Sequence, residues 1–198
     1  NDTCVSATVE YELARRNPSE YARIIAGLAG PDQKVTLRGG EVLQTKDGAL
    51  ATMSSDTRGA ASKLFQGSAM EYANGRATYD PRTDKNSSGR MGLSENEEAK
   101  FAGQVFGLPK FGWSTVKGKE AIVVDALKQI DGSKPVLLNF DIGKGSGHAC
   151  AFVKVEGDRV YFRNPTPGNT TLVPDARIDD PATGLQSMSV DDFRRHCN

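Results

Sequence analysis

Apolar residues at the start of the chain recur with the spacing of a helix. Val5, Val9 and Leu13 follow one another at intervals of four residues, so on a helix they form one apolar stripe. Asp2 and Thr3 stand directly before this stripe, and both residue types are common at helix N-termini. The pattern therefore predicts a helix that begins at the start of the chain.

The same criteria predict the remaining elements. Helices are indicated by periodic apolar residues with caps or glycine stops, and strands by short apolar runs between turn residues. A polar, turn-rich segment at 78–92 is predicted to be an exposed loop. The predicted helices are 18–29, 57–73, a segment after the capping box of Ser94 and Glu97, 119–130, and a terminal helix after Ser189; the predicted strands lie within 34–45, 134–142, a hairpin over 147–165, and a short run before Ser189.

The order of these elements indicates the fold class. Helices come first, and mostly antiparallel strands follow with one or two late helices, which is the order of an α+β protein with helices packed on a sheet. At 198 residues the chain is expected to form a single domain, 1–198. Because it begins with Asn1 and not with methionine, we expect it to be a processed product or a fragment of a longer protein.

Composition and charge narrow the classes of partner. Hydrophobic residues make up 37% of the chain, charged residues make up 25%, and the formal net charge is zero. Such a balance gives no electrostatic reason to expect nucleic acid or an anionic membrane as a partner. No apolar run approaches the roughly 18 residues that a membrane-spanning helix needs, so no membrane span is expected.

The cysteines favour neither a disulfide scaffold nor a metal centre. The chain has Cys4, Cys150 and Cys197, and an odd count leaves at least one thiol outside any disulfide; a bridge between Cys4 and Cys197 stays open. No CxxC spacing indicates structural zinc. A metal site of His148, Cys150, His196 and Cys197 can be drawn, but the terminal pair is too loosely placed to favour it. We therefore expect no metal and no cofactor.

Cys4 is the first candidate for chemistry. It falls in the first turn of the predicted helix, with Thr3 as the expected cap. The N–H groups and the positive end of the helix dipole favour a thiolate at that position. A buried cysteine that serves only as a small hydrophobe is the structural alternative.

His148 is the second candidate, and its partner is Asn164. A three-residue loop at 156–158 would place Asn164 opposite Cys150 and diagonal to His148, within side-chain reach. Asn164 could then accept the ring N–H of His148 and fix its orientation, as the third group of a nucleophile–base pair does. A one-residue change of register would turn Asn164 to the other face. Cys150 lies in mid-strand and is interpreted as a core residue.

The combination of these motifs resembles the papain-like cysteine peptidases, and most closely their bacterial C39-like branch, the bacteriocin-leader-peptidase-like proteins. The resemblance covers both ends of the chain, whereas residues 32–115 carry no recognised motif. The motifs are Asp2-Thr3-Cys4, the strand 134–138, Gly147-His148, Asn164-Pro165 and the segment 187–193.

The resemblance implies a papain-like fold and a thiol protease mechanism. Cys4 would be the nucleophile, His148 the base and Asn164 the orienting residue, acting on a protein or peptide substrate through a thioester. The family usually supplies an oxyanion donor, most often glutamine, several residues before the cysteine. Only three residues precede Cys4 here. Asn1 could be the donor, the donor could belong to a missing N-terminal part, or a residue from elsewhere in the chain could replace it; the backbone N–H of Cys4 is expected to contribute in each case. Val5-Ser6 also stands where the family often has Gly-Pro.

Other functions remain open at this point. The same three residues would serve a deamidase, a transglutaminase or a peptidoglycan amidase, and the fold could also serve as a catalytically inactive binding module. A bacterial effector or toxin domain, secreted or delivered as part of a larger protein, would suit a chain without an initial methionine. A cognate inhibitor or immunity protein would then be a further partner.

Overall fold

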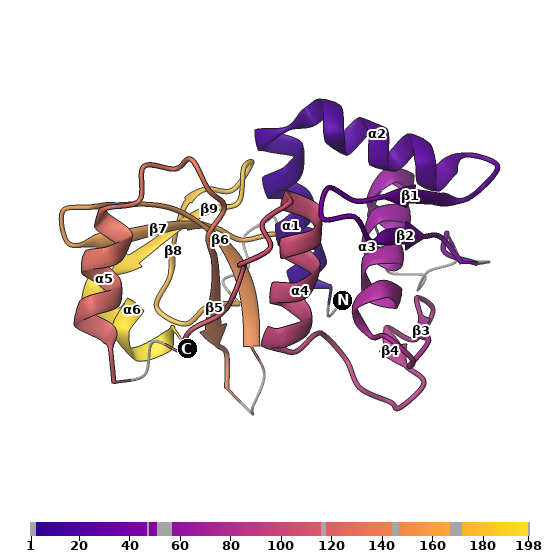
Figure 1. Cartoon of the computed structure of the whole chain (residues 1–198). Helices are drawn as coiled ribbons and strands as arrows, with labels where there is room; N and C mark the ends of the chain where they lie inside the picture. Colours follow the sequence, from indigo (N-terminus) through magenta and orange to yellow (C-terminus); the bar gives the residue numbers. More distant parts are fainter. Residues whose placement is uncertain are drawn as a thin grey trace. The chain divides into compact units, whose positions relative to one another are not determined.

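The structure is an α+β fold with six helices and antiparallel sheets in the described residues (Figure 1). The computed structural model describes residues 3–46, 48–50, 57–115, 118–143, 147–166 and 172–197. The chain divides into two compact units, residues 1–113 and 114–198. The α+β class predicted from the sequence is confirmed, and each unit is described below by itself.

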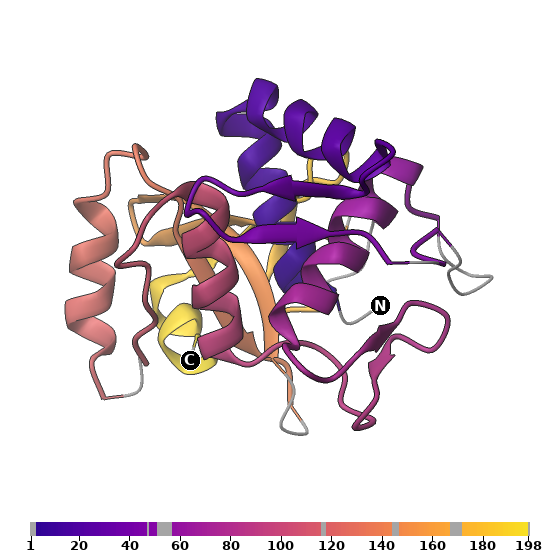
Figure 2. The same ribbon diagram turned by 45° about the vertical axis from the view of Figure 1, so that its right-hand side comes forward.

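The first unit is mainly helical. Two short antiparallel hairpins accompany its helices, and the hairpin of β1 and β2 runs along α2 and α3 (Figure 2). Its elements are α1 (Cys4–Arg16), α2 (Pro18–Ala29), β1 (Lys34–Thr36), β2 (Val42–Gln44), α3 (Ala60–Ala73), β3 (Tyr79–Asp80), β4 (Lys85–Asn86) and α4 (Glu95–Phe106).

The apolar stripe at the start of the chain is buried in this unit. Val5, Val9 and Leu13 are at most 4% exposed, so the predicted face of α1 is the face that packs. Phe65 of α3 and Phe101 of α4 are completely buried and meet edge to face, with ring centroids 6.0 Å apart. Each such side chain contributes roughly 1.5–3 kcal/mol through burial.

Local capping fixes the ends of several helices. The side chain of Asn17 accepts the N–H of Glu20 at 3.2 Å, and α2 begins at Pro18 as predicted. The predicted capping box also forms, with the N–H of Ser94 donating to the Glu97 carboxylate at 2.8 Å. The third helix begins at Ala60 and not at residue 57.

The segment 78–92 is more ordered than the sequence predicted. It holds β3 and β4, and the Tyr79 hydroxyl donates to the Asp84 carboxylate at 2.6 Å. The side-chain amide of Asn86 donates to Asn74 at 2.8 Å. Polar side chains that bind one another in this way fold a short hairpin without an apolar run, which explains why the hydrophobic pattern did not reveal it.

The second unit is a five-stranded antiparallel sheet with two helices. The strand order is β5-β6-β7-β9-β8, and the edge strand β8 was not predicted. The elements are α5 (Glu120–Lys128), β5 (Leu137–Asp141), β6 (Gly147–Glu156), β7 (Arg159–Arg163), β8 (Arg177–Asp180), β9 (Leu185–Ser189) and α6 (Val190–His196).

The core of this unit lies between the sheet and its two helices. Phe140 of β5 packs against Phe162 of β7, with ring centroids 4.7 Å apart, and against Phe193 of α6 at 6.0 Å. Leu127 of α5 belongs to the same cluster. Cys150 is completely buried there, which confirms its interpretation as a core residue.

The hairpin of β6 and β7 differs from its predicted register at the tip. Its turn has two residues, Gly157 and Asp158, so Val155 pairs with Val160 and not with Arg159. Gly157 has a φ of 60°, a backbone conformation that glycine adopts without strain. The tip is therefore one residue out of the register that the sequence predicted.

A β-bulge farther along the same hairpin cancels this shift. The pairing skips Val153, so Phe152 lies opposite Phe162 and Ala151 lies opposite Arg163. Continued by one residue, this register sets Asn164 opposite Cys150, as the sequence predicted. Because side chains alternate between faces, the extra residue decides which face Asn164 occupies.

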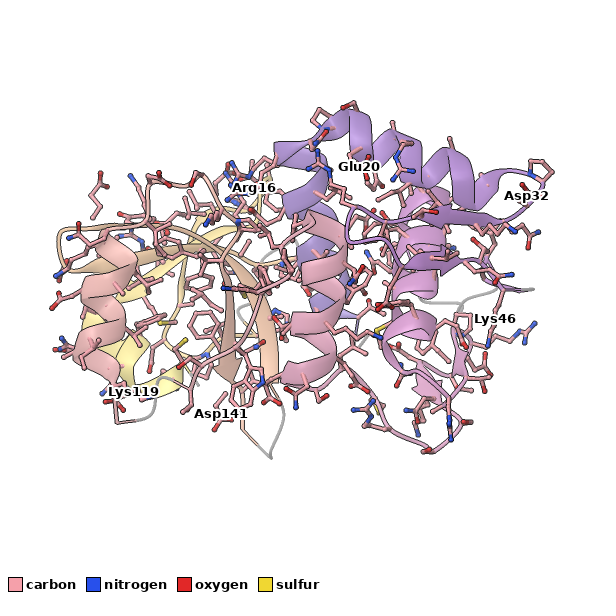
Figure 3. All side chains as sticks on the ribbon, in the orientation of Figure 1. Arg16, Glu20, Asp32, Lys46, Lys119 and Asp141 are labelled. Atoms are coloured by element: carbon pink, nitrogen blue, oxygen red, sulfur yellow. The ribbon has the colours of Figure 1, made fainter. Side chains whose placement is uncertain are left out.

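Each unit has exposed charged side chains on its surface. Asp32 and Lys46 of the first unit and Lys119 and Asp141 of the second are exposed (Figure 3). Across the residues that the structure describes, no helix combines the length and the apolar character needed to cross a membrane.

Candidate active site

His148 lies near the start of β6 and inside the second unit. It pairs with Phe140 of β5, and its exposed fraction is only 4%. The strand alternation puts it on the same face as Cys150, the face that carries the core. Cys150 and Phe152 on that face belong to the apolar cluster, and burial removes most water from the ring, so its orientation depends on protein groups.

Asn164 supplies the polar partner of His148. It follows β7 and is 3% exposed, and the distance between its Oδ1 atom and Nε2 of His148 is 2.9 Å. The same Oδ1 accepts the backbone N–H of Thr166 at 2.9 Å. A backbone N–H can only donate, so the atom that faces both groups is the oxygen of the Asn164 amide.

The assignment of this oxygen fixes the tautomer of His148. Because Oδ1 of Asn164 can only accept, Nε2 of His148 carries the hydrogen of the neutral ring. The lone pair is then on Nδ1. The predicted contact between the two residues is thus present, and it leaves Nδ1 as the nitrogen that can take up a proton.

Two residues of the β9 region hold Asn164 from the other side. The backbone N–H of Asn164 donates to the carbonyl of Gly184 at 2.9 Å, and a Cβ at Gly184 would lie 2.5 Å from the carbonyl oxygen of Asn164. The side-chain Nδ2 of Asn164 donates to Oε1 of Gln186 at 3.4 Å. The sequence interpretation missed both residues, although a glutamine in line with the core residue Met188 was a signal.

Burial lowers the pKa of His148 below its ordinary value of 6.5, and the bond to Asn164 opposes this shift. Water stabilises the charged imidazolium better than the buried site does, and the hydrogen bond to Asn164 replaces only part of that lost solvation. Where no anion lies beside it, His148 is therefore neutral at pH 7 and able to act as a base. Its neutral burial stabilises the fold fully above pH 6.5, and this contribution is lost as the pH falls through the pKa of the folded state.

We expect the pKa of His148 in the Cys4→Ala protein to lie below 6.5 and to fall further when Asn164 is also replaced by alanine. The alanine removes the acceptor that favours the charged ring, so only desolvation remains. An NMR titration checks this, because the chain has two histidines and the signal of His196 is identified by its loss in His196→Gln. A His148 pKa above 6.5 in the Cys4→Ala protein would contradict the expectation.

Cys4 belongs to the first unit, where it is the first residue of α1. Its side chain is half-buried. The N–H groups of the first helical turn have no acceptor within the helix, and the helix dipole adds positive potential there. The predicted cap, Thr3, holds the N-cap position, but its hydroxyl donates to Gln66 at 3.0 Å and makes no capping bond.

A buried polar network surrounds this end of α1. The Gln66 side chain donates to Glu10 at 2.7 Å and accepts from Arg58 at 2.7 Å. The same Arg58 nitrogen lies 3.3 Å from the hydroxyl of Thr3. The Arg58 guanidinium thus contacts Thr3, the residue before Cys4. Its positive charge, like the helix dipole, favours the thiolate form of a nearby cysteine.

The other cysteines do not provide a second reactive thiol. Cys150 is completely buried, and burial raises the pKa of Cys197 to about 12. All three cysteines lie in the described part of the chain, and none is in a disulfide. No cluster of three or more histidine, cysteine, aspartate or glutamate side chains suited to a metal ion occurs among the described residues.

The predicted site residues thus fall into two groups. His148 and Asn164 meet in the second unit, and Cys4 opens the first helix of the first unit. Asn1, the predicted oxyanion donor, lies outside the described residues.

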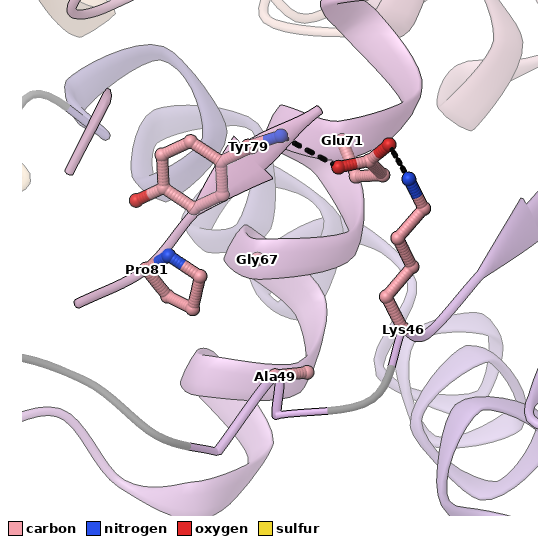
Figure 4. Close-up of a pocket in the computed structure, with 6 residues that line it drawn as sticks. All are labelled: Lys46, Ala49, Gly67, Glu71, Tyr79 and Pro81. Carbon is pink, nitrogen blue, oxygen red and sulfur yellow. Dashed lines mark hydrogen bonds and ion pairs between the residues drawn. The ribbon is translucent and has the colours of Figure 1, made fainter. Parts of the chain in front are cut away.

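A small pocket in the first unit contains none of the predicted site residues (Figure 4). Its volume is about 30 Å³, which suits a few water molecules at most. The ion pair of Lys46 and Glu71 lines one side, and Glu71 also accepts the N–H of Tyr79 at 2.7 Å. These contacts satisfy the polar groups of the pocket wall, so the pocket carries no functional argument.

No protein-family model matches the chain, and a search of curated proteins and of solved structures returned no significant match.

Proposed function

We propose that this protein is a cysteine peptidase of papain-like fold that hydrolyses amide bonds in a protein or peptide. Cys4 is the nucleophile, His148 the general base and acid, and Asn164 the residue that orients the imidazole. The observation that carries the proposal is the 2.9 Å contact between Nε2 of His148 and Oδ1 of Asn164. It supports the proposal because a catalytic base needs one defined tautomer and one defined direction.

The protonation states support the same roles. Neutral His148, with its lone pair on Nδ1, takes the proton of the Cys4 thiol, and the resulting thiolate is favoured at a helix N-terminus. In this proposal Nδ1 of His148 is the atom that takes up this proton. The Arg58 guanidinium beside Thr3 adds positive charge on the side of the nucleophile, and the Glu10 carboxylate that binds Gln66 offsets part of it.

The reaction then proceeds through a thioester. The Cys4 sulfur attacks the carbonyl carbon of the substrate amide, and the carbonyl π electrons move to the oxygen. When the intermediate collapses, the C–N bond breaks and His148 Nδ1 gives its proton to the leaving amine. Water then attacks the thioester carbon while His148 takes one of its protons. The C–S bond breaks, the carboxylic acid product leaves, and His148 returns the proton to the sulfur of Cys4. The backbone N–H of Cys4 is the proposed oxyanion donor.

Cys4 is expected to be the first thiol alkylated by iodoacetamide at mildly acidic pH. A thiolate paired with an imidazolium reacts at a pH where an ordinary thiol is almost fully protonated. The buried Cys150 and Cys197 should react only after unfolding. The measurement is the rate of alkylation at each cysteine between pH 5 and 8, read by peptide mass spectrometry.

Two variants serve as controls for this experiment. In His148→Gln the reactivity of Cys4 at acidic pH should disappear, because the imidazolium partner is gone, whereas His196→Gln should change nothing. If Cys4 reacts no faster than a free cysteine, the proposed pairing is wrong. The pairing also implies that the pKa of His148 is higher in the wild-type protein than in Cys4→Ala, since only the former contains the thiolate.

A further inference from the structure

Gln186 is a polar residue in a position that the strand pattern reserves for the core. It lies in β9 two residues before Met188, so both side chains point to the same face of the sheet. Met188 belongs to the apolar cluster, and Gln186 is only 1% exposed. A buried amide is costly unless its polar atoms find partners, so its presence there calls for a reason.

The partner of Gln186 is the side chain that holds His148. Its Oε1 accepts from Nδ2 of Asn164 at 3.4 Å, which is longer than the roughly 2.7–3.2 Å of most such bonds. At the opposite end of the Asn164 amide, Oδ1 faces two donors, Nε2 of His148 and the N–H of Thr166. Donors therefore surround the oxygen of Asn164, and an acceptor faces its nitrogen.

This arrangement permits one orientation of the Asn164 amide. If the amide turned by 180°, its NH2 group would face the N–H of Thr166, and its oxygen would face the oxygen of Gln186. Both contacts would be repulsive in a buried site, where water cannot intervene. Nε2 of His148 would then face a donor, which favours the tautomer with hydrogen on Nδ1 and removes the lone pair that the base needs.

We propose that Gln186 is a positioning residue: its side-chain carbonyl locks the Asn164 amide so that Oδ1 faces His148 and selects the Nε2–H tautomer. The catalytic consequence rests on the proposed function, whereas the tautomer lock does not depend on it. Gln186 touches no reacting atom in this scheme and acts only through Asn164.

The decisive variant is Gln186→Met, which keeps most of the side-chain length and removes the acceptor. In the Cys4→Ala background, the imidazole ¹⁵N shifts of His148 report which nitrogen carries hydrogen. We expect almost pure Nε2–H tautomer with Gln186 and a measurable Nδ1–H fraction with methionine, because the N–H of Thr166 then holds the amide without the second contact. In the active protein, kcat should fall about tenfold and KM should stay unchanged. A tenfold loss is what removal of one hydrogen bond that orients the catalytic base would cause.

Three controls separate positioning from general damage. Gln186→Glu keeps an oxygen at the same place, so it should restore the Nε2–H tautomer. Ser187→Ala removes a completely buried hydroxyl of the same strand, one that accepts from Arg159; it should lower stability and leave the tautomer unchanged. In an Asn164→Ala background, Gln186→Met should have no further effect on the tautomer or on kcat, because the lock acts through Asn164.

A folded Gln186→Met protein with an unchanged His148 tautomer overturns the proposal, and so does a full effect of Gln186→Met without Asn164. If the methionine variant does not fold, hydrogen exchange of the Asn164 side-chain amide in the wild-type chain decides: strong protection supports the lock, and rapid exchange overturns it. A tautomer shift in a protein that hydrolyses no amide would support the lock while rejecting the peptidase.

Discussion

Replacement of Cys4 by alanine is expected to lower amide hydrolysis by at least about a thousandfold and to leave the fold intact. Without the sulfur no thioester forms, and the remaining groups can only polarise the substrate. Cys4 is half-buried at a helix start, so loss of its thiol should change the free energy of unfolding by less than about 1 kcal/mol. The measurement compares turnover and thermal unfolding of the two proteins.

Product analysis makes this comparison informative about the reaction as well. Incubation of a peptide mixture with the wild-type protein should create new N-termini that are absent with Cys4→Ala. New carboxylates at glutamine or asparagine side chains, or new isopeptide bonds, would instead indicate deamidation or transglutamination through the same thioester. Cys197→Ala is the matched control, since it also removes a thiol and should keep activity. Full activity in Cys4→Ala would refute the proposed nucleophile.

Replacement of His148 by alanine should abolish turnover to a similar degree. Both proton transfers, from the thiol and to the leaving amine, pass through its Nδ1 in the proposed mechanism, and general acid–base catalysis together with activation of the nucleophile supports a loss of a thousandfold or more. His196→Ala is the natural comparison, because His196 is the other histidine, lies at the end of α6 and contacts the Asp175 carboxylate at 2.9 Å.

The pH dependence distinguishes a missing base from a damaged fold. His148→Ala should lose the acidic limb of the activity profile, so that the residual rate rises with hydroxide and shows no titration near neutral pH. The His196→Ala protein should keep the wild-type profile. A His148→Ala protein that retains more than about a tenth of the wild-type activity would remove His148 from the mechanism, whatever its contact with Asn164.

Much of the architecture could be predicted from the sequence, because local patterns of residues specify it. The stripe of Val5, Val9 and Leu13 fixes the buried face of α1, and the caps at Asn17 and Ser94 fix where two helices begin. These signals involve residues a few positions apart, so the physics of a single helix turn suffices to interpret them. The hairpin of β3 and β4 lacked such a signal, since polar side chains and not an apolar run hold it together.

The register of the β6–β7 hairpin could not be predicted in full from such local patterns. The predicted loop was one residue too long, and the bulge at Val153 was not foreseen. The two differences cancel, so Asn164 reaches His148 even though the tip pairs differently. Turn length and bulges depend on how the whole sheet twists and packs, and this information is spread over several strands.

The sequence by itself determined the α+β class and the helix that begins near Cys4. It also identified His148 and Asn164 as a candidate hydrogen-bonded pair. Tertiary structure alone decided which atoms meet: that Asn164 turns its oxygen to His148, that Thr166 and Gln186 hold it there, and that burial lowers the pKa of His148. The physical reason is that hydrogen-bond direction and desolvation arise from groups brought together by folding. Residue type and spacing along the chain contain neither.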